Sequence, residues 1–128
     1  MSDKPVFQKL QIKPGSRVVI INPPPGYHST LGTLPAGVRP LPEPEEPVDI
    51  IQVFVANRQE LEDQLPRLKA FLKPGGMLWV TYIKGTSKLK TDIHRDSINA
   101  YAKTLGLEGV AMVSIDADWS ALRLKQVA

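Results

Sequence analysis

Residues 13–21 read Lys-Pro-Gly-Ser-Arg-Val-Val-Ile-Ile, and residues 73–83 read Lys-Pro-Gly-Gly-Met-Leu-Trp-Val-Thr-Tyr-Ile. In both stretches a Lys-Pro-Gly turn leads into a run of mostly apolar residues, the pattern of a strand buried on both faces. Such strands are typical of parallel sheets covered by helices. The sequence therefore predicts an α/β fold, with the strand Arg17–Asn22 at the centre of the sheet and Met77–Ile83 as a later strand.

A strand and a helix are predicted between these two turns. Residues 48–55 form a second apolar run, and Asn57 followed by Glu60 has the spacing of a helix N-cap with its reciprocal glutamate. Leucines recur at helical spacing after this cap, so one side of the helix is apolar. Pro66 interrupts the backbone hydrogen bonds and predicts a kink or two abutting segments. Residues 73–76 are expected to end the helix through glycines in left-handed conformation.

The remaining elements are predicted by the same patterns. A second helix is expected from Thr91 or Asp92 to Gly106, followed by strands at 109–115 and 121–127 that form an antiparallel hairpin. Residues 38–41 are expected to form a short edge strand whose orientation stays open. A parallel strand leaves residues 42–47 barely long enough to return along the sheet, and the alternatives are an antiparallel strand or none. Residues 42–47 are rich in proline and glutamate, which predicts a stiff, extended linker. Residues 1–12 are expected to be a loosely attached arm or a short helix.

Length and composition favour one globular domain spanning residues 1–128. Hydrophobic residues make up 42% of the chain and charged residues 23%, as in ordinary folded proteins. The absence of cysteine excludes disulfides and thiol chemistry. No apolar run approaches the ~18 residues of a membrane span, and the first residues lack the apolar region of a signal peptide. We therefore expect a cytoplasmic protein without membrane contact.

The charges are mixed rather than concentrated. Sixteen Lys and Arg are opposed by 13 Asp and Glu, giving a formal net charge of +3. The densest basic stretch contains Lys84, Lys88 and Lys90 and lacks the interleaved aromatic residues of a single-strand-binding groove. We interpret it as a solvated loop and do not expect nucleic-acid binding.

The predicted order of elements resembles the Rossmann-like fold of class I S-adenosylmethionine-dependent methyltransferases. The terminal hairpin carries most of this likeness, and the turns at 12–18 and 72–78 resemble the entries to the first and fifth strands of those enzymes. The resemblance implies a mostly parallel sheet with an antiparallel C-terminal hairpin, abridged by the loss of crossover helices.

A second resemblance is closer. Residues 22–27, Asn-Pro-Pro-Pro-Gly-Tyr, and residues 116–122, Asp-Ala-Asp-Trp-Ser-Ala-Leu, are similar to a family of small bacterial proteins known only as a domain of unknown function. This likeness spans roughly residues 10–124. It implies a compact methyltransferase-like domain and supplies no mechanism.

The first loop departs from the methyltransferase pattern. Pro23, Pro24 and Pro25 remove three backbone donors where those enzymes have small residues that let the backbone approach the cofactor. An acidic residue that could hold ribose hydroxyls is expected at the end of the second strand, and Glu43 is the nearest substitute. The sequence therefore predicts no cofactor, with S-adenosylmethionine kept as the alternative ligand.

Five residues are candidates for a ligand site at the carboxyl edge of the sheet, where open α/β sheets bind ligands: Asn22, Gly26, Tyr27, His28 and Lys84. No catalytic residue is assigned. For His28 a surface loop position is the competing interpretation.

Three other candidates are not assigned to a site, and His94 among them is interpreted as solvent-facing. His94 has no partner at metal-ligand spacing, and no metal site is predicted. Asp116 and Asp118 are interpreted as turn-formers rather than as paired catalytic carboxylates.

Two functions remain open at this point. The first is a non-catalytic binding or interaction module that lacks a competent S-adenosylmethionine loop, with a second copy of the chain or another protein as partner. The alternative is a divergent small methyltransferase or nucleotide-binding enzyme that uses the loop Asn22–Tyr27.

Overall fold

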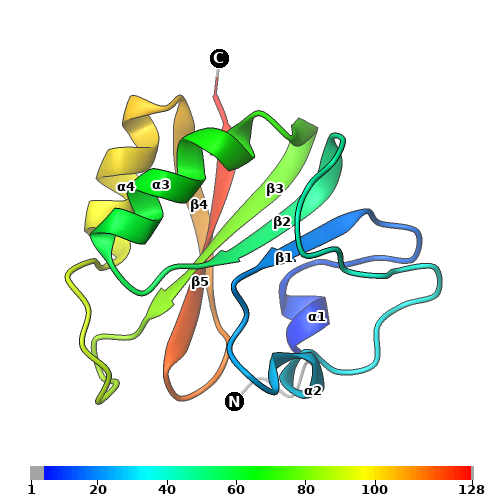
Figure 1. The fold of residues 1–128 in the computed structure, drawn as a ribbon, viewed down its shortest axis with the longest axis horizontal. Coiled ribbons are helices and arrows are strands. Elements are labelled where there is room, and N and C mark those ends of the chain that lie inside the picture. The colour runs from blue at the N-terminus through cyan, green and yellow to red at the C-terminus, as the bar shows by residue number, and fades with distance from the viewer. Residues whose placement is uncertain (1–4, 128) are drawn as a thin grey trace.

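A computed structural model describes residues 5–127 as one open five-stranded sheet with helices on both faces (Figure 1). The strand order is β1-β2-β3-β5-β4, in which β1, β2 and β3 are parallel while β5 and β4 form an antiparallel pair at one side. The fold is therefore the predicted α/β class. The elements in chain order are α1 (Val6–Lys9), β1 (Val18–Ile21), α2 (Tyr27–Leu31), β2 (Val48–Phe54), α3 (Arg58–Lys69), β3 (Leu72–Ile83), α4 (Arg95–Thr104), β4 (Leu107–Ser114) and β5 (Trp119–Gln126).

Strand β1 is buried along its whole length, as its β-branched sequence predicts, but it lies at the edge of the sheet. The expectation that it forms the centre was wrong. On its other side, the described residues 5–127 form a single parallel bridge, between Val19 and Leu41. The N–H of Ile20 donates to the carbonyl of Leu41 (2.9 Å), and the N–H of Leu41 donates to the carbonyl of Val18 (3.0 Å).

The predicted strand at 38–41 is accordingly reduced to that bridge. Pro40 and Pro42 flank Leu41 and have no N–H to donate, so a longer ladder cannot form around it. The bridge is parallel, which excludes the antiparallel orientation that the sequence left open.

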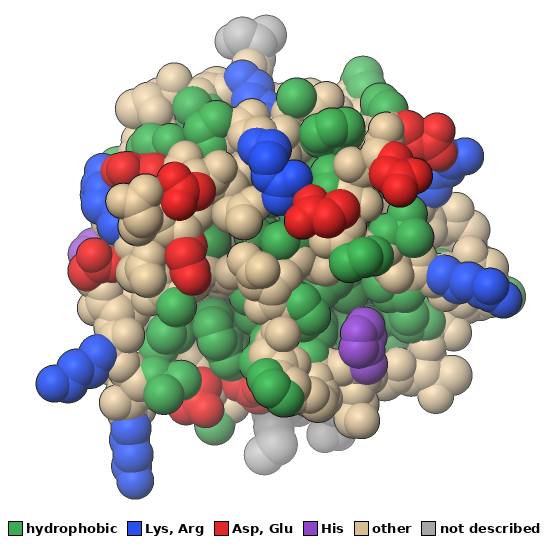
Figure 2. Space-filling view, in the orientation of Figure 1, with side chains coloured by type: hydrophobic (Ala, Val, Ile, Leu, Met, Phe, Trp, Pro, Cys, Tyr) green, Lys and Arg blue, Asp and Glu red, His purple; other side chains and the backbone are tan. Residues whose placement is uncertain are grey.

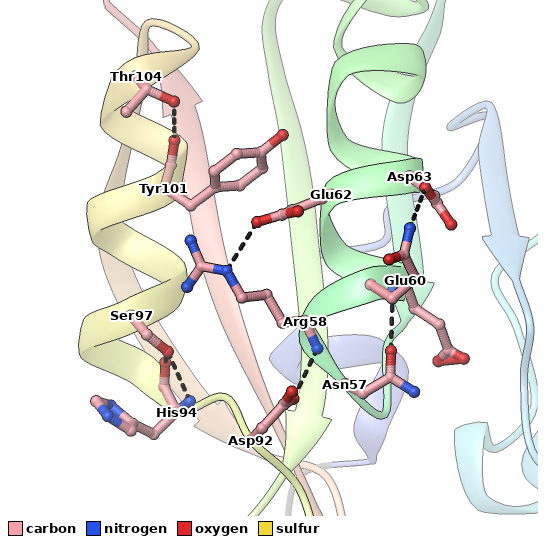
Figure 3. Close-up of polar contacts among 11 residues, drawn as sticks. Asn57, Arg58, Glu60, Glu62, Asp63, Asp92, His94, Ser97, Tyr101 and Thr104 are labelled. Atoms are coloured by element: carbon pink, nitrogen blue, oxygen red, sulfur yellow. Dashed lines mark hydrogen bonds and ion pairs between the residues drawn. The ribbon is translucent and has the colours of Figure 1, made fainter.

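Helices α3 and α4 cover one face of the sheet (Figure 1). Helix α3 begins at the predicted cap, where the Asn57 side chain accepts the N–H of Glu60 (2.9 Å; Figure 3). The Glu60 carboxylate accepts the N–H of Ala56 (2.7 Å), one residue before the expected reciprocal partner. Pro66 lies inside one continuous helix and does not divide it into two segments.

Helix α4 begins later than expected. Asp92 accepts the backbone N–H of Arg58 (2.7 Å) and so ties the preceding loop to the start of α3 (Figure 3). The first helical residue is Arg95, and the hydroxyl of Ser97 accepts the N–H of the N-cap residue His94 (2.9 Å). Both terminal strands begin about two residues earlier than predicted.

Residues 73–76 also differ from the prediction, because they lie within β3 rather than in a separate turn. The pairing with β2 shifts there, since Val48 is opposite Leu72 while Ile50 is opposite Met77. The extra residues of β3, 73–76, therefore form an irregularity in its pairing with β2. A side chain at Gly76 would come within 2.9–3.0 Å of backbone oxygens.

The other face of the sheet is covered by the N-terminal arm, α1 and α2 (Figure 1). Of the two expectations for this arm, the described part forms the short helix. Leu10 is fully buried, and its carbonyl accepts the indole N–H of Trp79 from the middle of β3 (3.1 Å). The arm therefore occupies the place of a crossover helix on this face.

Candidate functional site at the carboxyl edge of the sheet

The loop after β1 is built from two backbone reversals and three prolines. Asn22 has a φ of 58° and Gly26 a φ of 81°, both in the left-handed region that glycine and asparagine tolerate best. Helix α2 follows at once and is only five residues long. The loop is therefore a stiff, local turn at the end of β1.

Tyr27 is buried under this loop, with 2% of its surface exposed. Its hydroxyl donates to the side-chain oxygen of Gln52 (2.7 Å), and the Gln52 amide donates to the hydroxyl of Thr81 (3.0 Å). Its ring packs edge-on against Phe54, with ring centroids 4.7 Å apart. Burial raises the pKa of the Tyr27 hydroxyl above its ordinary value of 10.0.

These contacts join the loop to β2 and β3 from within the core. Gln52 and Thr81 are 1% and 0% exposed, so their polar groups depend on this chain of bonds. The Tyr27 hydroxyl faces the sheet and not the solvent. We call these three side chains the buried polar chain.

A surface cavity of about 400 Å³ lies beside the loop at the outer edge of β1. Its size falls within the range of small-molecule sites. Asn22 and His28 line it, so two of the predicted residues do meet there. Glu43 and Leu41 line it from the opposite side.

Glu43 was not among the five candidate site residues, although the sequence singled it out as the nearest substitute for an acid that holds ribose hydroxyls. Its carboxylate accepts a hydrogen bond from Arg67 of α3 (2.8 Å), and its side chain is 60% exposed. The carboxylate is therefore oriented by α3 and still accessible at the cavity.

Besides the buried Tyr27, two further predicted residues lie away from this cavity. Gly26 does not line it, and a side chain built at Gly26 would meet no atom within 4 Å. Lys84 follows β3, where its ammonium donates to the Ser114 hydroxyl (2.6 Å) and its N–H donates to the carbonyl of Asp118 (2.8 Å). Lys84 thus holds the β4–β5 loop.

Asp116 forms the turn in this loop as the sequence predicts, whereas the Asp118 carboxylate accepts a hydrogen bond from the hydroxyl of Ser87 (2.8 Å) in the loop after β3. The Asp116 carboxylate accepts the N–H groups of Asp118 (2.8 Å) and Trp119 (3.0 Å), which makes it a turn-former. Within residues 5–127 no group of three or more potential ligands is placed to hold a metal ion.

The charged surface is mixed as well. Figure 2 shows acidic and basic side chains interspersed over one face of the molecule, with apolar side chains between them. No helix in the described part of the chain is long and apolar enough to cross a bilayer.

The fit of a methyltransferase-type cofactor can be judged from the loop itself. Pro23, Pro24 and Pro25 have no N–H, and the N–H of Tyr27 donates back to the carbonyl of Pro24 (3.1 Å). The loop therefore offers little of the backbone donor array with which such loops hold a ligand. Glu43 and Asn22 at the cavity could contact ligand hydroxyls, but the loop does not fit the rest of the cofactor.

Solved structures with a similar fold include methyltransferases. Ribosomal protein L11 methylase from Lactobacillus delbrueckii subsp. bulgaricus matches with a TM-score of 0.63 and 10% identity over 95% of this chain and 75% of that chain. The DhpI–SAH complex matches with a TM-score of 0.65 and 10% identity over 95% and 82%. The B. subtilis M1A22 tRNA methyltransferase TrmK matches with a TM-score of 0.57 and 12% identity over 98% and 66%.

No protein-family model matches the sequence, and no curated protein matches it. The likeness to solved structures is a likeness of fold, because all of these identities are low. The methyltransferase-like fold is thus confirmed. Membership of the small bacterial family is not confirmed and stays a prediction.

Proposed function

We propose that the protein is a non-catalytic binding or interaction module built on a methyltransferase-like scaffold. The observation that carries this proposal is the buried polar chain, in which Tyr27 turns the first loop inward against Gln52 and Thr81. The loop that follows the first strand is the usual ligand-binding element of open α/β sheets. Here its largest polar side chain stabilises the core instead.

The proline sequence supports the same conclusion. A loop that closes around a cofactor needs free N–H groups and room for the backbone to approach the ligand. Pro23–Pro25 provide neither free N–H groups nor this room for the backbone. Helix α2 has only five residues and does not add a row of N–H groups to the loop. The cavity beside the loop is left with three polar side chains at its rim, those of Asn22, His28 and Glu43.

That cavity favours a second candidate function, binding of S-adenosylmethionine or S-adenosylhomocysteine (SAH). One structure with this fold is a complex with SAH, so these compounds are the first ligands to test. In this alternative, Glu43 would accept ligand hydroxyl hydrogens and Asn22 would contribute an amide. The cofactor would supply an activated methyl group, and the chain would only bind and orient it.

Thermal unfolding in the presence of 1 mM SAH separates the two proposals. A ligand at ~100 times its dissociation constant adds about 2.7 kcal/mol to the unfolding free energy, which raises the Tm by several degrees. The proposed module predicts no selective shift with SAH relative to adenosine or ATP. A selective shift would establish the alternative.

A pair of variants gives that measurement a matched control. Glu43→Gln changes the cavity, whereas Glu62→Gln changes a carboxylate that accepts a similar bond from Arg58 (2.7 Å) on the exposed side of α3. A SAH-dependent shift that is lost in Glu43→Gln and kept in Glu62→Gln would place the ligand in the cavity.

A further inference from the structure

The two edges of the sheet differ in their protection against a further strand. At the β1 edge, Pro40 and Pro42 flank Leu41 and block additional pairing. At the other edge, the eight residues of β4 contain neither proline nor lysine, and their protection is confined to a bulge between Gly109 and Ala111 and to two bonds from side chains. Asn99 accepts the N–H of Gly109 (2.9 Å), and Lys9 donates to the carbonyl of Ser114 (3.0 Å). In the described part of the chain, β4 pairs with β5 alone.

The β4 edge also carries apolar side chains in solvent. Val110 and Met112 are 42% and 46% exposed. The pairing with β5 shifts between Gly109 and Ala111, so Val110 has no partner residue on β5. A shallow cavity of about 360 Å³ beside this strand is lined by Val110, Met112 and residues of α4.

Helix α4 presents charges of opposite sign along the same edge. Asp96, Asn99 and Lys103 are spaced by three and four residues, so they lie on one side of the helix. Asp96 and Asn99 line the cavity next to β4, which places this side of α4 toward the edge. Asp96 is in the first turn, with its side chain 81% exposed, and Lys103 is in the last turn.

We propose that two copies of the chain associate through antiparallel pairing of their β4 edges around a two-fold axis. The edge N–H and C=O groups other than those bonded by Asn99 and Lys9 then find partners, and Val110 and Met112 are buried against the second copy. The two-fold axis sets the two α4 helices side by side and antiparallel on one face of the joined sheet. Asp96 of each copy lies opposite Lys103 of the other, which makes the interface complementary in charge as well as in hydrogen bonding.

This interface is distinct from the cavity at the carboxyl end of β1, because β1 and β4 are at opposite edges of the sheet. The dimer therefore goes beyond the proposed function and does not require SAH binding or its absence.

Sedimentation equilibrium over a range of concentrations up to about 1 mM tests the proposal with a matched pair of variants. Met112→Lys and Leu41→Lys place a charge at positions of nearly equal exposure, 46% and 48%, on opposite edges. We expect wild type and Leu41→Lys to reach twice the monomer mass of 14.1 kDa, and Met112→Lys to remain monomeric. A monomeric wild type, or a dimer that survives Met112→Lys and is lost in Leu41→Lys, would overturn the proposal.

A charge exchange tests the two-fold arrangement with exposed helix positions that leave the core untouched. Asp96→Lys should weaken dimerisation by roughly tenfold, because two pairs become repulsive. Adding Lys103→Asp should restore it. The two residues are about 10 Å apart along one helix, so they cannot pair within a chain. Failure of the double exchange to restore the dimer would contradict the antiparallel placement of α4.

Discussion

Replacing Tyr27 with phenylalanine should destabilise the protein by about 2 kcal/mol. The ring still packs against Phe54, but the side-chain oxygen of Gln52, 1% exposed, loses its donor from Tyr27 (2.7 Å). A buried polar group left without a partner costs about 1–3 kcal/mol. The variant should fold with the same secondary structure, since no apolar volume is removed.

Urea denaturation followed by circular dichroism measures this loss. With an m-value of about 2 kcal/mol/M, the midpoint should fall by about 1 M. Tyr82→Phe is the matched control, because its hydroxyl contacts only the weak thioether acceptor of Met112 (2.9 Å), and we expect it to cost under about 1 kcal/mol. Equal losses in the two variants would refute the structural role of the Tyr27 hydroxyl.

A triple variant separates the buried polar chain from packing. Tyr27→Phe with Gln52→Met and Thr81→Val removes every member of the chain, so no donor or acceptor is left unpaired by the others. We expect it to recover about half of the stability lost in Tyr27→Phe alone. A triple variant less stable than the single one would show that the cost is steric.

Three further predictions concern backbone geometry, capping and pH. Gly76→Ala should lower the unfolding free energy by more than about 1 kcal/mol, because the added carbon would come within 3.0 Å of backbone oxygens. Gly85→Ala is the control: no atom lies within 4 Å of its added carbon, so the unfolding free energy should change by under about 0.5 kcal/mol. Asn57→Ala should cost about 1 kcal/mol through loss of the α3 cap, whereas Asn57→Asp should retain most of it; equal urea midpoints for the two would argue against the cap. The raised pKa of Tyr27 means that the unfolded state loses its proton first, near pH 10, so its contribution is present below pH 10 and is lost as the pH rises further. The unfolding free energy of the wild type should therefore fall by up to about 1.4 kcal/mol per pH unit above pH 10, more steeply than that of Tyr27→Phe. If the unfolding free energies of the two proteins fall in parallel with pH, Tyr27 is not the group responsible.

The sequence patterns predicted the strands and α3 well, because the formation of each of these elements depends mainly on residues close together in the chain. The Asn57 cap and the β-branched run of β1 are signals of this kind. The position of β1 at the sheet edge could not be read this way, since strand order depends on contacts between distant segments. In the described part of the chain, β1 pairs with β2 on one side and has the isolated bridge to Leu41 on the other, and nothing in residues 17–21 reports this.

The site was predicted less completely for a related reason. Asn22 reaches the cavity because it follows β1 directly, and His28 reaches it from α2, which follows the short loop after β1. Tyr27 was expected near a cleft, but its burial depends on Gln52, a polar residue inside an otherwise apolar strand. A buried amide side chain needs a hydrogen-bond partner. This requirement of Gln52 was the signal in the sequence from which a buried partner such as Tyr27 could have been predicted.

The most direct test of the account is a titration of the ¹⁵N-labelled protein with SAH, followed by the amide resonances of Asn22, Gly26 and His28. If the first loop is a structural element closed against the sheet, these resonances should show no saturable shift up to about 1 mM SAH. Saturable shifts of Gly26 and His28 at micromolar SAH, abolished in Glu43→Gln, would show that the loop still binds a cofactor and would contradict the non-catalytic module.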